Sequence, residues 1–487
     1  ALRATRGTAK TGLTDDAFTR SRPANDGGKN PRLEQTSGIL HRNRPNYALA
    51  LAGIWEKSKG KVATFFIETS YSKRRAQSMT YAQLADAIVK TGILSDPWLN
   101  GDERFRLEPI VLTQDAYARL CDAAEAIGKA YHELAKIVWN APTLLDDFFH
   151  LTPFQKLMWF SSGGMWHVIA RLDAFLTSDG RIQICEMNSD TPSGEAEAVL
   201  LNELLQQENL TNPNADFERA FCDAVFECYR RNASQIKPNP TIAIVYPTDL
   251  PEDLSMIELY RRWFEKRGSE VVLGAPQNLR GTKQGSVALF GREVDILIRH
   301  YKTDWWGERE SAWLDGEAFL DPDPLSTELL WLIEAERKGK LCLVNPFGAV
   351  LTQNKLSLAF LWAHLDKFSA ENQNAIRAHI PKSLRLCDVA DARALRKDDW
   401  VLKSDYGCEG EEVIVGKDAS EEVWREALRK AKPTRWILQR YFDAEKDGEI
   451  SNFGIYLVAG RASGVFARVS KSATDGAAKC AATFVKP

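Results

Sequence analysis

The segment from Thr241 to Val344 alternates short apolar runs with stretches of helical periodicity, and this pattern restricts the fold more than any other. Its first run, TIAIVY at Thr241–Tyr246, is apolar throughout, which is typical of a strand buried on both faces of a parallel sheet. Strands and helices that alternate at this spacing predict an α/β fold with a doubly wound domain. The further strands are expected at Glu270–Leu273, Val287–Phe290, Asp295–Arg299 and Leu341–Val344, and the helices at Ser255–Lys266 and Ser326–Lys338. No GxGxxG motif follows the first strand, so the pattern does not support a nicotinamide or flavin site.

The sequence on either side of this segment indicates the domain organisation. Lys237-Pro-Asn-Pro240 is a turn-rich linker, and Asp115–Trp139 has the clearest helical periodicity in the chain. Residues 1–45 hold nine Lys or Arg against four Asp or Glu with few apolar residues, which predicts a flexible basic arm. Aromatic side chains do not alternate with its charges, so a nucleic-acid-binding arm is not favoured. The expected parts are the basic arm at 1–45, a helical region with the metal-ligand part at 46–236, the doubly wound domain at 237–345 and a lysine and lid part at 346–487.

The segment Arg171–Gly194, RLDAFLTSDGRIQICEMNSDTPSG, predicts a β-hairpin because two alternating runs flank the turn sequence TSDG. Side chains two residues apart in a strand point to one face, so Arg171 and Asp173 share a face, as do Glu186 and Asn188. The turn position places Asp173 roughly opposite Glu186. Two carboxylates and an amide form an oxygen set that suits Mg²⁺, with phosphate oxygens as further ligands. An ordinary surface hairpin with charges on its solvent face is the alternative.

A turn and a helix follow the hairpin. Asp190 begins the turn sequence DTPSG, and helical periodicity resumes with Val199, Leu200 and Leu204. Ser193 is the predicted N-cap of this helix. Free backbone amides at such a helix start suit an anion.

Two lysines interrupt apolar segments in the last third of the chain. Lys355 stands at the entry of an expected helix, where a positive charge is unfavourable against the helix dipole unless an anion lies nearby. Lys403 lies in an expected strand, and a loop with Tyr406, Gly407 and Gly410 follows it. Strand, lysine, glycine-bearing loop and strand is the layout of a flexible lid over a triphosphate. A plain hairpin turn is the alternative explanation of the two glycines.

The rest of the chain adds one more apolar strand and no familiar catalytic motif. The strand is expected at Trp436–Phe442 and contains Gln439, Arg440 and Tyr441; two further strands end on Arg468. The sequence lacks a P-loop, a kinase-type HRD loop, a GxSxG elbow and an HExxH motif. Any phosphate chemistry therefore needs another scaffold.

Together, these motifs resemble the circularly permuted ATP-grasp proteins, and in particular the synthetase domain of glutathionylspermidine synthase. The similar region runs from about Phe160 to Pro487. The order of the motifs is informative, because the metal-ligand hairpin precedes the lysines and the lid, as the permuted group requires. The resemblance implies an α/β fold, namely a circularly permuted ATP-grasp with an inserted doubly wound preATP-grasp-like domain. The matching motifs are RLDAFL with GRIQICEMNSDTPSG, VNPFGAVLTQNKLSLAFL, WVLKSDYGCEGEEVIVG, WILQRYF and GRASGVFARVS.

The resemblance also implies a role for each polar position. Asp173, Glu186 and Asn188 would hold Mg²⁺ that bridges the ATP phosphates. Arg171 and Arg468 would stabilise the transferring phosphoryl group. Lys355 and Lys403 would contact the ATP phosphates, and Lys403 would also lie near the adenine pocket. Residues 406–411, with Tyr406, Gly407 and Gly410 among them, would form the lid. The backbone around Gln439, Arg440 and Tyr441 would meet the adenine edge.

The reaction implied by the resemblance is that of an ATP-dependent carboxylate–amine ligase. A carboxylate attacks the γ-phosphate, and an amine then displaces phosphate from the acyl phosphate to give an amide and ADP. Such phosphoryl transfer needs no protein nucleophile. The partners would be a small-molecule or peptide carboxylate and an amine, but the family's thiol-peptide and polyamine pockets are not recognisable, so those substrates are not carried over. The alternatives are a phosphotransferase on the same scaffold and a non-catalytic nucleotide-binding scaffold protein.

The composition and the cysteines restrict the binding partners and the cellular compartment that we expect. The net charge of −3 gives no electrostatic case for nucleic acid or an anionic membrane. No stretch approaches the roughly 18 apolar residues that span a bilayer. Eight cysteines without a CxxC pair favour free thiols in a reducing, cytoplasmic setting over a disulfide framework or a zinc site. The first of them is Cys121, so the cysteine amidase half that often precedes the family's synthetase domain is not expected.

Overall fold

The computed structural model describes residues 79–248, 253–306, 325–407, 412–471 and 477–487, which all belong to one compact unit of the chain, Phe66–Pro487. The expected basic arm at 1–45 and the lid residue Gly410 lie outside the described residues. None of the described helices is long and apolar enough to cross a membrane.

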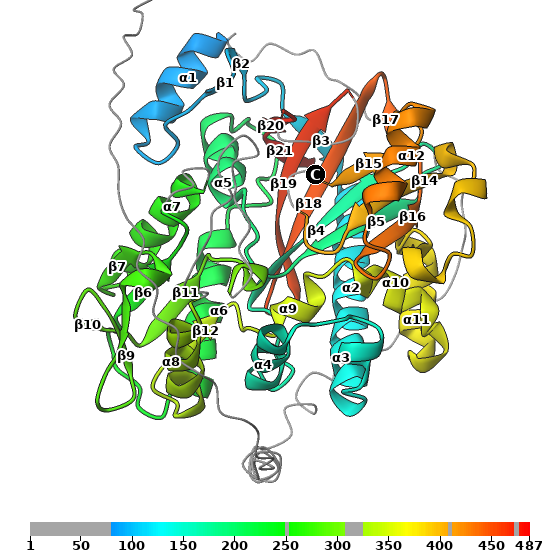
Figure 1. The fold of residues 1–487 in the computed structure, drawn as a ribbon. Coiled ribbons are helices and arrows are strands. Elements are labelled where there is room, and N and C mark those ends of the chain that lie inside the picture. The colour runs from blue at the N-terminus through cyan, green and yellow to red at the C-terminus, as the bar shows by residue number, and fades with distance from the viewer. Residues whose placement is uncertain (1–78, 249–252, 307–324, 408–411, 472–476) are drawn as a thin grey trace, which may run out of the picture. The chain divides into compact units, whose positions relative to one another are not determined.

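A four-stranded parallel sheet forms the doubly wound part of the fold (Figure 1). The alternating residues of its strand β6 enter two different cores: Ile242 and Ile244 pack with helices α6 and α7, whereas Ala243 and Val245 pack with helix α8. Both faces are therefore covered, which explains the continuous apolar sequence and confirms the predicted doubly wound arrangement. The sheet order is β12 (Cys342–Val344), β11 (Ile296–Arg299), β6 (Ile242–Val245) and β7 (Val271–Gly274), and the helices are α6 (Phe217–Asn232), α7 (Leu254–Glu265) and α8 (Ser326–Arg337).

The strand predicted at Val287–Phe290 exists but belongs to a different sheet. Strand β9 (Val287–Leu289) pairs antiparallel with β8 (Leu279–Gly281) and β10 (Arg292–Glu293). Phe290 and Gly291 have φ angles of 49° and 79° and form a two-residue turn that returns the chain at once. Such a hairpin does not provide the long crossover that a parallel strand needs.

An antiparallel sheet contains the hairpin of β4 (Ile169–Leu176) and β5 (Ile182–Asn188), which we call the polar hairpin. Strands β4 and β5 are the two strands predicted from the sequence, and Asp173 lies opposite Glu186, as the turn position predicted. One extra residue, Cys185, bulges from β5 next to this pair, because Ala174 is already opposite Ile184. The sheet order is β20 (Lys479–Ala481), β19 (Arg461–Ser470), β18 (Glu449–Val458), β4 (Ile169–Leu176) and β5 (Ile182–Asn188), with β17 (Glu445–Lys446) paired to β18.

Helix α2 (Gln114–Asn140) covers one face of this antiparallel sheet and confirms the helix predicted from its periodicity. Leu172 of β4 packs with α2 in the main core. Gly128 allows the helix to approach β18 closely, since a Cβ atom there would lie 2.7 Å from Cδ1 of Leu457. Because side chains alternate along a strand, the opposite face of β4 presents Arg171 and Asp173.

The two lysines lie in and beside a third sheet. Lys403 is part of β14 as predicted, and Lys355 is the residue directly before helix α10. This antiparallel sheet has the order β13 (Ser383–Arg385), β16 (Trp436–Arg440), β14 (Trp400–Ser404) and β15 (Val413–Val415). The remaining elements are α1 (Tyr81–Lys90), β1 (Trp98–Leu99), β2 (Asp102–Glu103), β3 (Ile110–Thr113), α3 (Leu144–Asp147), α4 (Pro153–Ser161), α5 (Glu195–Leu204), α9 (Ala349–Thr352), α10 (Leu356–Ala363), α11 (Ala370–His379), α12 (Glu421–Lys430) and β21 (Thr483–Lys486), which pairs with β3.

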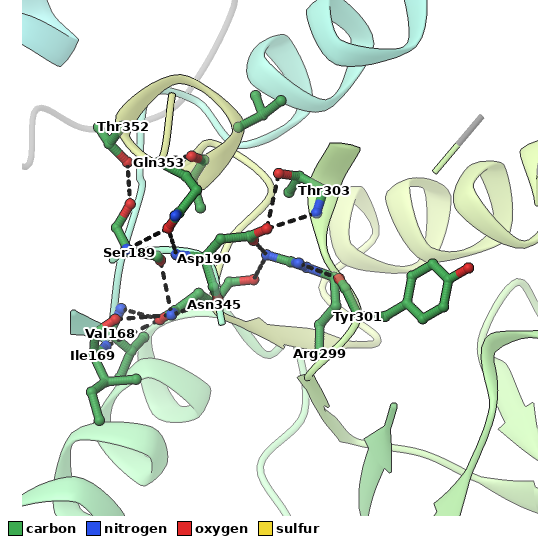
Figure 2. Close-up of polar contacts among 12 residues, drawn as sticks. Val168, Ile169, Ser189, Asp190, Arg299, Tyr301, Thr303, Asn345, Thr352 and Gln353 are labelled. Atoms are coloured by element: carbon green, nitrogen blue, oxygen red, sulfur yellow. Dashed lines mark hydrogen bonds and ion pairs between the residues drawn. The ribbon is translucent and has the colours of Figure 1, made fainter. Parts of the chain in front are cut away.

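A buried ion pair joins the polar hairpin to the parallel sheet (Figure 2). Arg299, at the end of β11, donates to Asp190 at 2.5 Å, and both side chains are almost fully buried. Thr303 satisfies the second carboxylate oxygen of Asp190 with its backbone N–H at 2.7 Å and its hydroxyl at 3.0 Å. Arg299 also donates to the carbonyl oxygen of Tyr301 at 2.6 Å. These bonds satisfy both oxygens of Asp190 and both terminal nitrogens of Arg299, whereas Nε of Arg299 has no partner among the described residues.

Two amide side chains complete this junction. The oxygen of Asn345, directly after β12, accepts the backbone N–H groups of Val168 and Ile169, and its nitrogen donates to the carbonyl oxygens of Ile169, Ser189 and Asp190. Gln353 accepts the N–H groups of Ser189 and Asp190 (Figure 2). The start of β4, the end of β5 and the segment after β12 are thereby held together.

The predicted N-cap of the following helix is wrong by one residue. Helix α5 begins after Gly194, which has a φ of 94°, and no side chain caps it. A Cβ atom at Gly194 would lie 2.6 Å from the ring of Phe466, so both the backbone conformation and the packing require glycine. Ser193 instead presents its carbonyl oxygen to Arg171 and Tyr456.

The first residue of α5 is a buried acid. Tyr260 of α7 donates to Oε1 of Glu195 at 3.0 Å, whereas Oε2 has no hydrogen-bond partner among the described residues. Burial raises the pKa of Glu195 to about 8. The carboxyl group is therefore protonated at neutral pH in the folded chain.

We expect Arg299→Met to lower the free energy of unfolding by about 3–5 kcal/mol, because the variant leaves the buried carboxylate of Asp190 without its counter-ion. Thermal or urea denaturation measures the change. The matched control is Arg429→Met, which removes an exposed arginine from an ion pair with Glu426 and should leave the transition unchanged. Equal effects of the two variants would contradict the importance of the buried pair.

We expect Glu195→Gln to stabilise the chain increasingly as the pH rises. Below about pH 4 the wild-type carboxyl group is protonated in both states. Between about pH 4 and pH 8 the unfolded chain loses this proton while the folded chain keeps it, so the wild type loses stability that the variant retains. The difference between the two free energies of unfolding should grow by roughly 3 kcal/mol from pH 5 to pH 8. Urea denaturation at several pH values measures it, and a constant difference would show that Glu195 does not titrate in this way.

Candidate functional site

The register of the antiparallel sheet places polar residues in a row on the face opposite α2. Arg468 of β19 pairs with Asn452 of β18, Gly454 of β18 pairs with Asp173 of β4, and Asp173 pairs with Glu186 of β5. Residues two apart share a face, so Arg171 and Asn188, which pair with each other, belong to the same row. The structure thus brings together the five residues that the sequence analysis assigned to the metal and the transferring phosphate.

A glycine makes room for the side chain of Arg171. The arginine lies across β18, and a Cβ atom at Gly454 would be 2.6 Å from its Cδ atom. Its guanidinium group donates to Oδ1 of Asp173 at 2.8 Å and to the carbonyl oxygen of Ser193 at 2.7 Å. Arg171 is therefore held in one direction by the sheet, by a carboxylate and by the turn before α5.

Asp173 is surrounded by donors. Its Oδ2 atom accepts from Nη2 of Arg468 at 2.8 Å and from the amide of Asn452 at 3.3 Å. Burial alone would raise its pKa, but Arg171 and Arg468 outweigh this effect and lower the pKa of Asp173 to about 2. The sequence analysis missed Asn452, because a single amide in an apolar strand gives no signal until the strand is paired.

Glu186 lies between Asn188 and Lys355. With the amide of Asn188 oriented so that both of its ends are satisfied, its nitrogen donates to Oε1 of Glu186 at 2.8 Å and its oxygen accepts from Nη2 of Arg171 at 3.2 Å. The second oxygen of Glu186 lies 3.7 Å from Nζ of Lys355, whose side chain is buried and also donates to the carbonyl oxygen of Gly407. The hairpin and the segment before α10 therefore meet at Glu186.

The second lysine is buried beside the hairpin bulge. Nζ of Lys403 donates to Oε1 of Gln439 at 2.7 Å and to the carbonyl oxygen of Cys185 at 3.3 Å. Gln439 in turn donates to Ser383 at 3.2 Å. These contacts connect β14 and β16 with β5, so Lys403 and Gln439 lie against the same hairpin as the carboxylates.

The other residues that were predicted to contact ATP do not all line the cleft. Tyr406 is buried and donates to the carbonyl oxygen of Val350 at 2.6 Å, so its hydroxyl faces the protein, although the residue borders the cleft described below. Gly407 and Tyr441 also border this cleft. The side chain of Arg440 is half exposed and pairs with Asp399 at 3.4 Å, and Arg440 does not line the cleft.

The centre of the site gathers four cationic side chains around two carboxylates. Two further carboxylates, Asp253 and Asp405, lie close enough to Arg171 and Lys355 for these cations to favour their ionised forms. Lys403 donates to uncharged partners, so an anionic group such as a phosphate would suit this part of the site. The six side chains are Arg171, Asp173, Glu186, Lys355, Lys403 and Arg468.

The donor set of the hairpin fits a hard divalent cation. Asp173, Glu186 and Asn188 supply only oxygen ligands, which is the chemistry that Mg²⁺ prefers. Within the described residues, no group of three or more His, Cys, Asp or Glu side chains gathers at one point. The set therefore has two carboxylates only, and an ion held here would complete its shell with water and phosphate oxygens.

A cleft of about 2770 Å³ extends from these residues to the parallel sheet. Pockets for a single small ligand usually measure about 300–1,000 Å³, so this cleft has room for a nucleotide and further substrates. Its wall combines Arg171, Asp173, Glu186 and Lys403 with residues from the loops after β6 and β11. Phe442, which the sequence analysis did not single out, also lines it beside Phe175, at 5.4 Å between ring centroids.

The parallel sheet contributes a histidine–aspartate pair that the sequence analysis missed. β7 and β11 lie on opposite sides of β6, so the winding reverses between β6 and β11, and ligands of open α/β sheets bind beyond such a switch point. Here Nε2 of His300 lies 2.7 Å from Oδ2 of Asp253, and both residues line the cleft. Although burial opposes ionisation, His300, Arg171 and Ser193 together lower the pKa of Asp253. The pair joins loops that are 47 residues apart, so no local pattern indicates it.

Comparison with known proteins gives the family. The model of the glutathionylspermidine synthase preATP-grasp family matches residues 101–486. Among solved structures, the chain is similar to a glutathione synthetase-like effector from Globodera pallida in its apo form, with 11% identity, coverage of 83% of this chain and 96% of that chain, and a TM-score of 0.53. This likeness concerns the fold alone.

A second solved structure is more distant. It is a putative γ-glutamylcysteine synthetase from Methylobacillus flagellatus KT, with 12% identity, coverage of 75% of this chain and 85% of that chain, and a TM-score of 0.40, which is too low to support an argument. No curated protein sequence matches the chain. Because the family model covers well over half of the sequence, the chain belongs to the glutathionylspermidine synthase preATP-grasp family and has the circularly permuted ATP-grasp fold with an inserted doubly wound domain.

Proposed function

We propose that this chain is an ATP-dependent carboxylate–amine ligase that forms an amide through an acyl phosphate and releases ADP and phosphate. The observation that carries the proposal is the convergence of three cationic side chains and two carboxylates at one end of a cleft that is large enough for a nucleotide and two further substrates, with Lys355 buried 3.7 Å from one of these carboxylates. Membership of the family supports the same class of reaction.

The proposed roles follow from the position of each cation. Arg171 and Arg468 converge on Asp173 and would contact the phosphoryl group in transfer, whereas Lys355 and Lys403 approach from the third sheet and would hold the other phosphates. These groups are fixed by hydrogen bonds before any substrate binds. Fixed donors that face developing negative charge stabilise a transition state without reorganisation.

Asp173, Glu186 and Asn188 would hold Mg²⁺. A divalent ion supplies charge neutralisation for the phosphate oxygens. Of the two carboxylates, Glu186 has the looser cationic contact, at 3.7 Å from Lys355, and is therefore the one that we expect to dominate metal binding. Asn188 would exchange its contact with Arg171 for the metal.

The adenine side of the nucleotide would lie against β14 and β16. The backbone N–H groups of Arg440 and Tyr441 already donate to the carbonyl oxygens of Lys382 and Asp399. Recognition of the base would therefore use carbonyl oxygens, Gln439 and the ring of Phe442, and not the guanidinium group of Arg440.

The division of the chain into an ATP-grasp part at 46–236 and 346–487 and an inserted domain at 237–345 belongs to the same proposal.

The Asp253–His300 pair would accept the proton that the amine loses. An alkylammonium ion has no lone pair for attack, so a ligase of this kind needs a proton acceptor near the acyl phosphate. Asp253 borders the cleft, and His300 and Arg171 lower its pKa, so the carboxylate is ionised and would stabilise a protonated His300 after the imidazole takes up the proton. The pair therefore lies at the boundary between the phosphate end of the cleft and the switch point of the parallel sheet.

The proposal is tested by ADP release from Mg-ATP with a panel of acid–amine pairs. Glutathione with spermidine is the first pair, because the family takes its name from their product. We expect ADP, phosphate and an amide, with no ADP above background when either partner is omitted. Release of AMP would overturn the acyl-phosphate mechanism, and a stable phosphorylated product without any amine would identify a phosphotransferase.

We expect Glu186→Gln to lower kcat for ADP release by at least about 100-fold, which is the usual effect of removing one group that neutralises charge in a transition state. Steady-state kinetics with the active pair measures the loss. The matched control is Glu371→Gln, which removes an exposed carboxylate that pairs with Lys129 on the surface, and it should retain wild-type kinetics. Full activity of Glu186→Gln would favour the non-catalytic alternative.

We expect Asp253→Asn to lose amide formation with alkylamines by about 100-fold, a typical contribution of general base catalysis, because the variant removes the carboxylate that would stabilise protonated His300. The same variant should retain most of its activity with hydroxylamine, because this nucleophile is already uncharged at neutral pH. Product analysis by mass spectrometry compares the two amines. Asp366→Asn, at an exposed position of a short 3-10 helix, is the control. Equal losses with both nucleophiles would show that the Asp253–His300 pair does not accept the proton.

A further inference from the structure

Two cysteines that are far apart in the sequence touch inside the parallel-sheet region. Cys228 belongs to α6 and Cys342 is the first residue of β12. Their sulfur atoms are 3.5 Å apart, with the thiol of Cys342 as donor to Cys228. The sequence analysis favoured free thiols for all eight cysteines and did not pair these two.

We propose that Cys228 and Cys342 form a site of reversible oxidation, in which a hydroperoxide converts the two thiols into a disulfide that links α6 to β12. A disulfide needs about 2.0 Å between its sulfur atoms, so closure requires the sulfurs to approach by about 1.5 Å. Small side-chain rotations supply a movement of this size, since the two backbone segments already pack against each other.

The two thiols have different surroundings. Cys228 is partly exposed, and the side-chain amide of Asn232 lies 3.4 Å from its sulfur. The hydrogen bond from Cys342 is the main cause that lowers the pKa of Cys228, and Asn232 acts in the same direction. Cys342 is buried, and its hydrogen bond to Cys228 together with burial raises its pKa. Cys228 is therefore the thiol that reacts first with an oxidant, as its thiolate.

The chemistry balances in two steps. The Cys228 thiolate attacks a hydroperoxide, the O–O bond breaks, and the products are a sulfenic acid at Cys228 and an alkoxide or hydroxide ion that takes up a proton. The Cys342 thiol then attacks the sulfenic sulfur, and its proton leaves with the hydroxyl group as water. The two sulfurs are oxidised by two electrons in total, and one peroxide is reduced.

The link would join two parts that meet at the candidate site. Cys342 lies three residues before Asn345, whose amide holds the start of β4 and the end of β5. Helix α6 also supplies Phe217, whose ring contacts Tyr456 of β18 at 4.9 Å between centroids. The inference does not depend on the proposed ligase activity, because it rests only on the geometry of the two thiols.

The test is oxidation of the native full-length chain with hydrogen peroxide, followed by alkylation with iodoacetamide, digestion without reductant and mass spectrometry. We expect a linked peptide that contains residues 228 and 342, with a mass two hydrogens below the sum of the reduced peptides. Dithiothreitol should reverse it. Oxidised chain should unfold at a higher urea concentration than reduced chain, since the link closes a loop of more than 100 residues.

Single cysteine variants show which sulfur reacts in each of the two steps. Cys342→Ser should abolish the link and leave a sulfenic acid that dimedone labels at Cys228, whereas Cys228→Ser should give neither the link nor dimedone labelling at Cys342. The matched control is Cys222→Ser, which removes a buried cysteine from the same helix and should leave the link intact. The proposal is overturned if Cys228 and Cys342 are both recovered alkylated after peroxide has oxidised the exposed Cys387.

Discussion

The contact of Asp190 with Arg299, at 2.5 Å and shielded from solvent, decides where the polar hairpin can lie. Asp190 follows the last strand residue of the hairpin by two positions, and Arg299 ends a strand of the parallel sheet. A buried ion pair is favoured when its other donors and acceptors are also satisfied; Thr303 binds the second oxygen of Asp190 and Tyr301 accepts from Nη1 of Arg299, which leaves only Nε of Arg299 unpartnered in this pair. The polar hairpin is therefore fixed to the carboxyl edge of the parallel sheet, and the cleft between them follows from that attachment.

The candidate site holds several cationic side chains close together, and contacts with the rest of the fold keep them there despite their repulsion. Arg171 and Arg468 share one carboxylate, and Lys355 and Lys403 are buried with only partial ionic compensation. Gly454 and the carbonyl oxygen of Ser193 hold Arg171 in place without neutralising it. Such an arrangement is unfavourable for stability alone, and it is the one expected where an anionic ligand supplies the missing charge.

Local patterns predicted local structure. The register of Asp173 with Glu186 was predictable because alternation and a turn sequence fix a hairpin within a few residues. The N-cap at Ser193 was wrong because the close approach of Phe466, far along the chain, requires glycine at the next position. The Asp253–His300 pair and the Cys228–Cys342 contact could not be predicted, since each joins residues that meet only through the order of strands in the parallel sheet. The prediction for Arg440 concerned its backbone at the adenine edge; its side chain pairs with Asp399 and does not line the cleft, because alternation turns it away from Gln439.

Strand β12 links these observations physically. It is three residues long, it carries Cys342 at its start, and it leads directly into Asn345. The amide of Asn345 makes five hydrogen bonds to the backbone of β4 and of the segment after β5. A displacement of the strand would therefore break hydrogen bonds at the base of the hairpin before it changed any charge in the site. Coupling between the thiol pair and the phosphate end of the cleft would thus act through backbone position, because neither sulfur contacts a residue of the polar row.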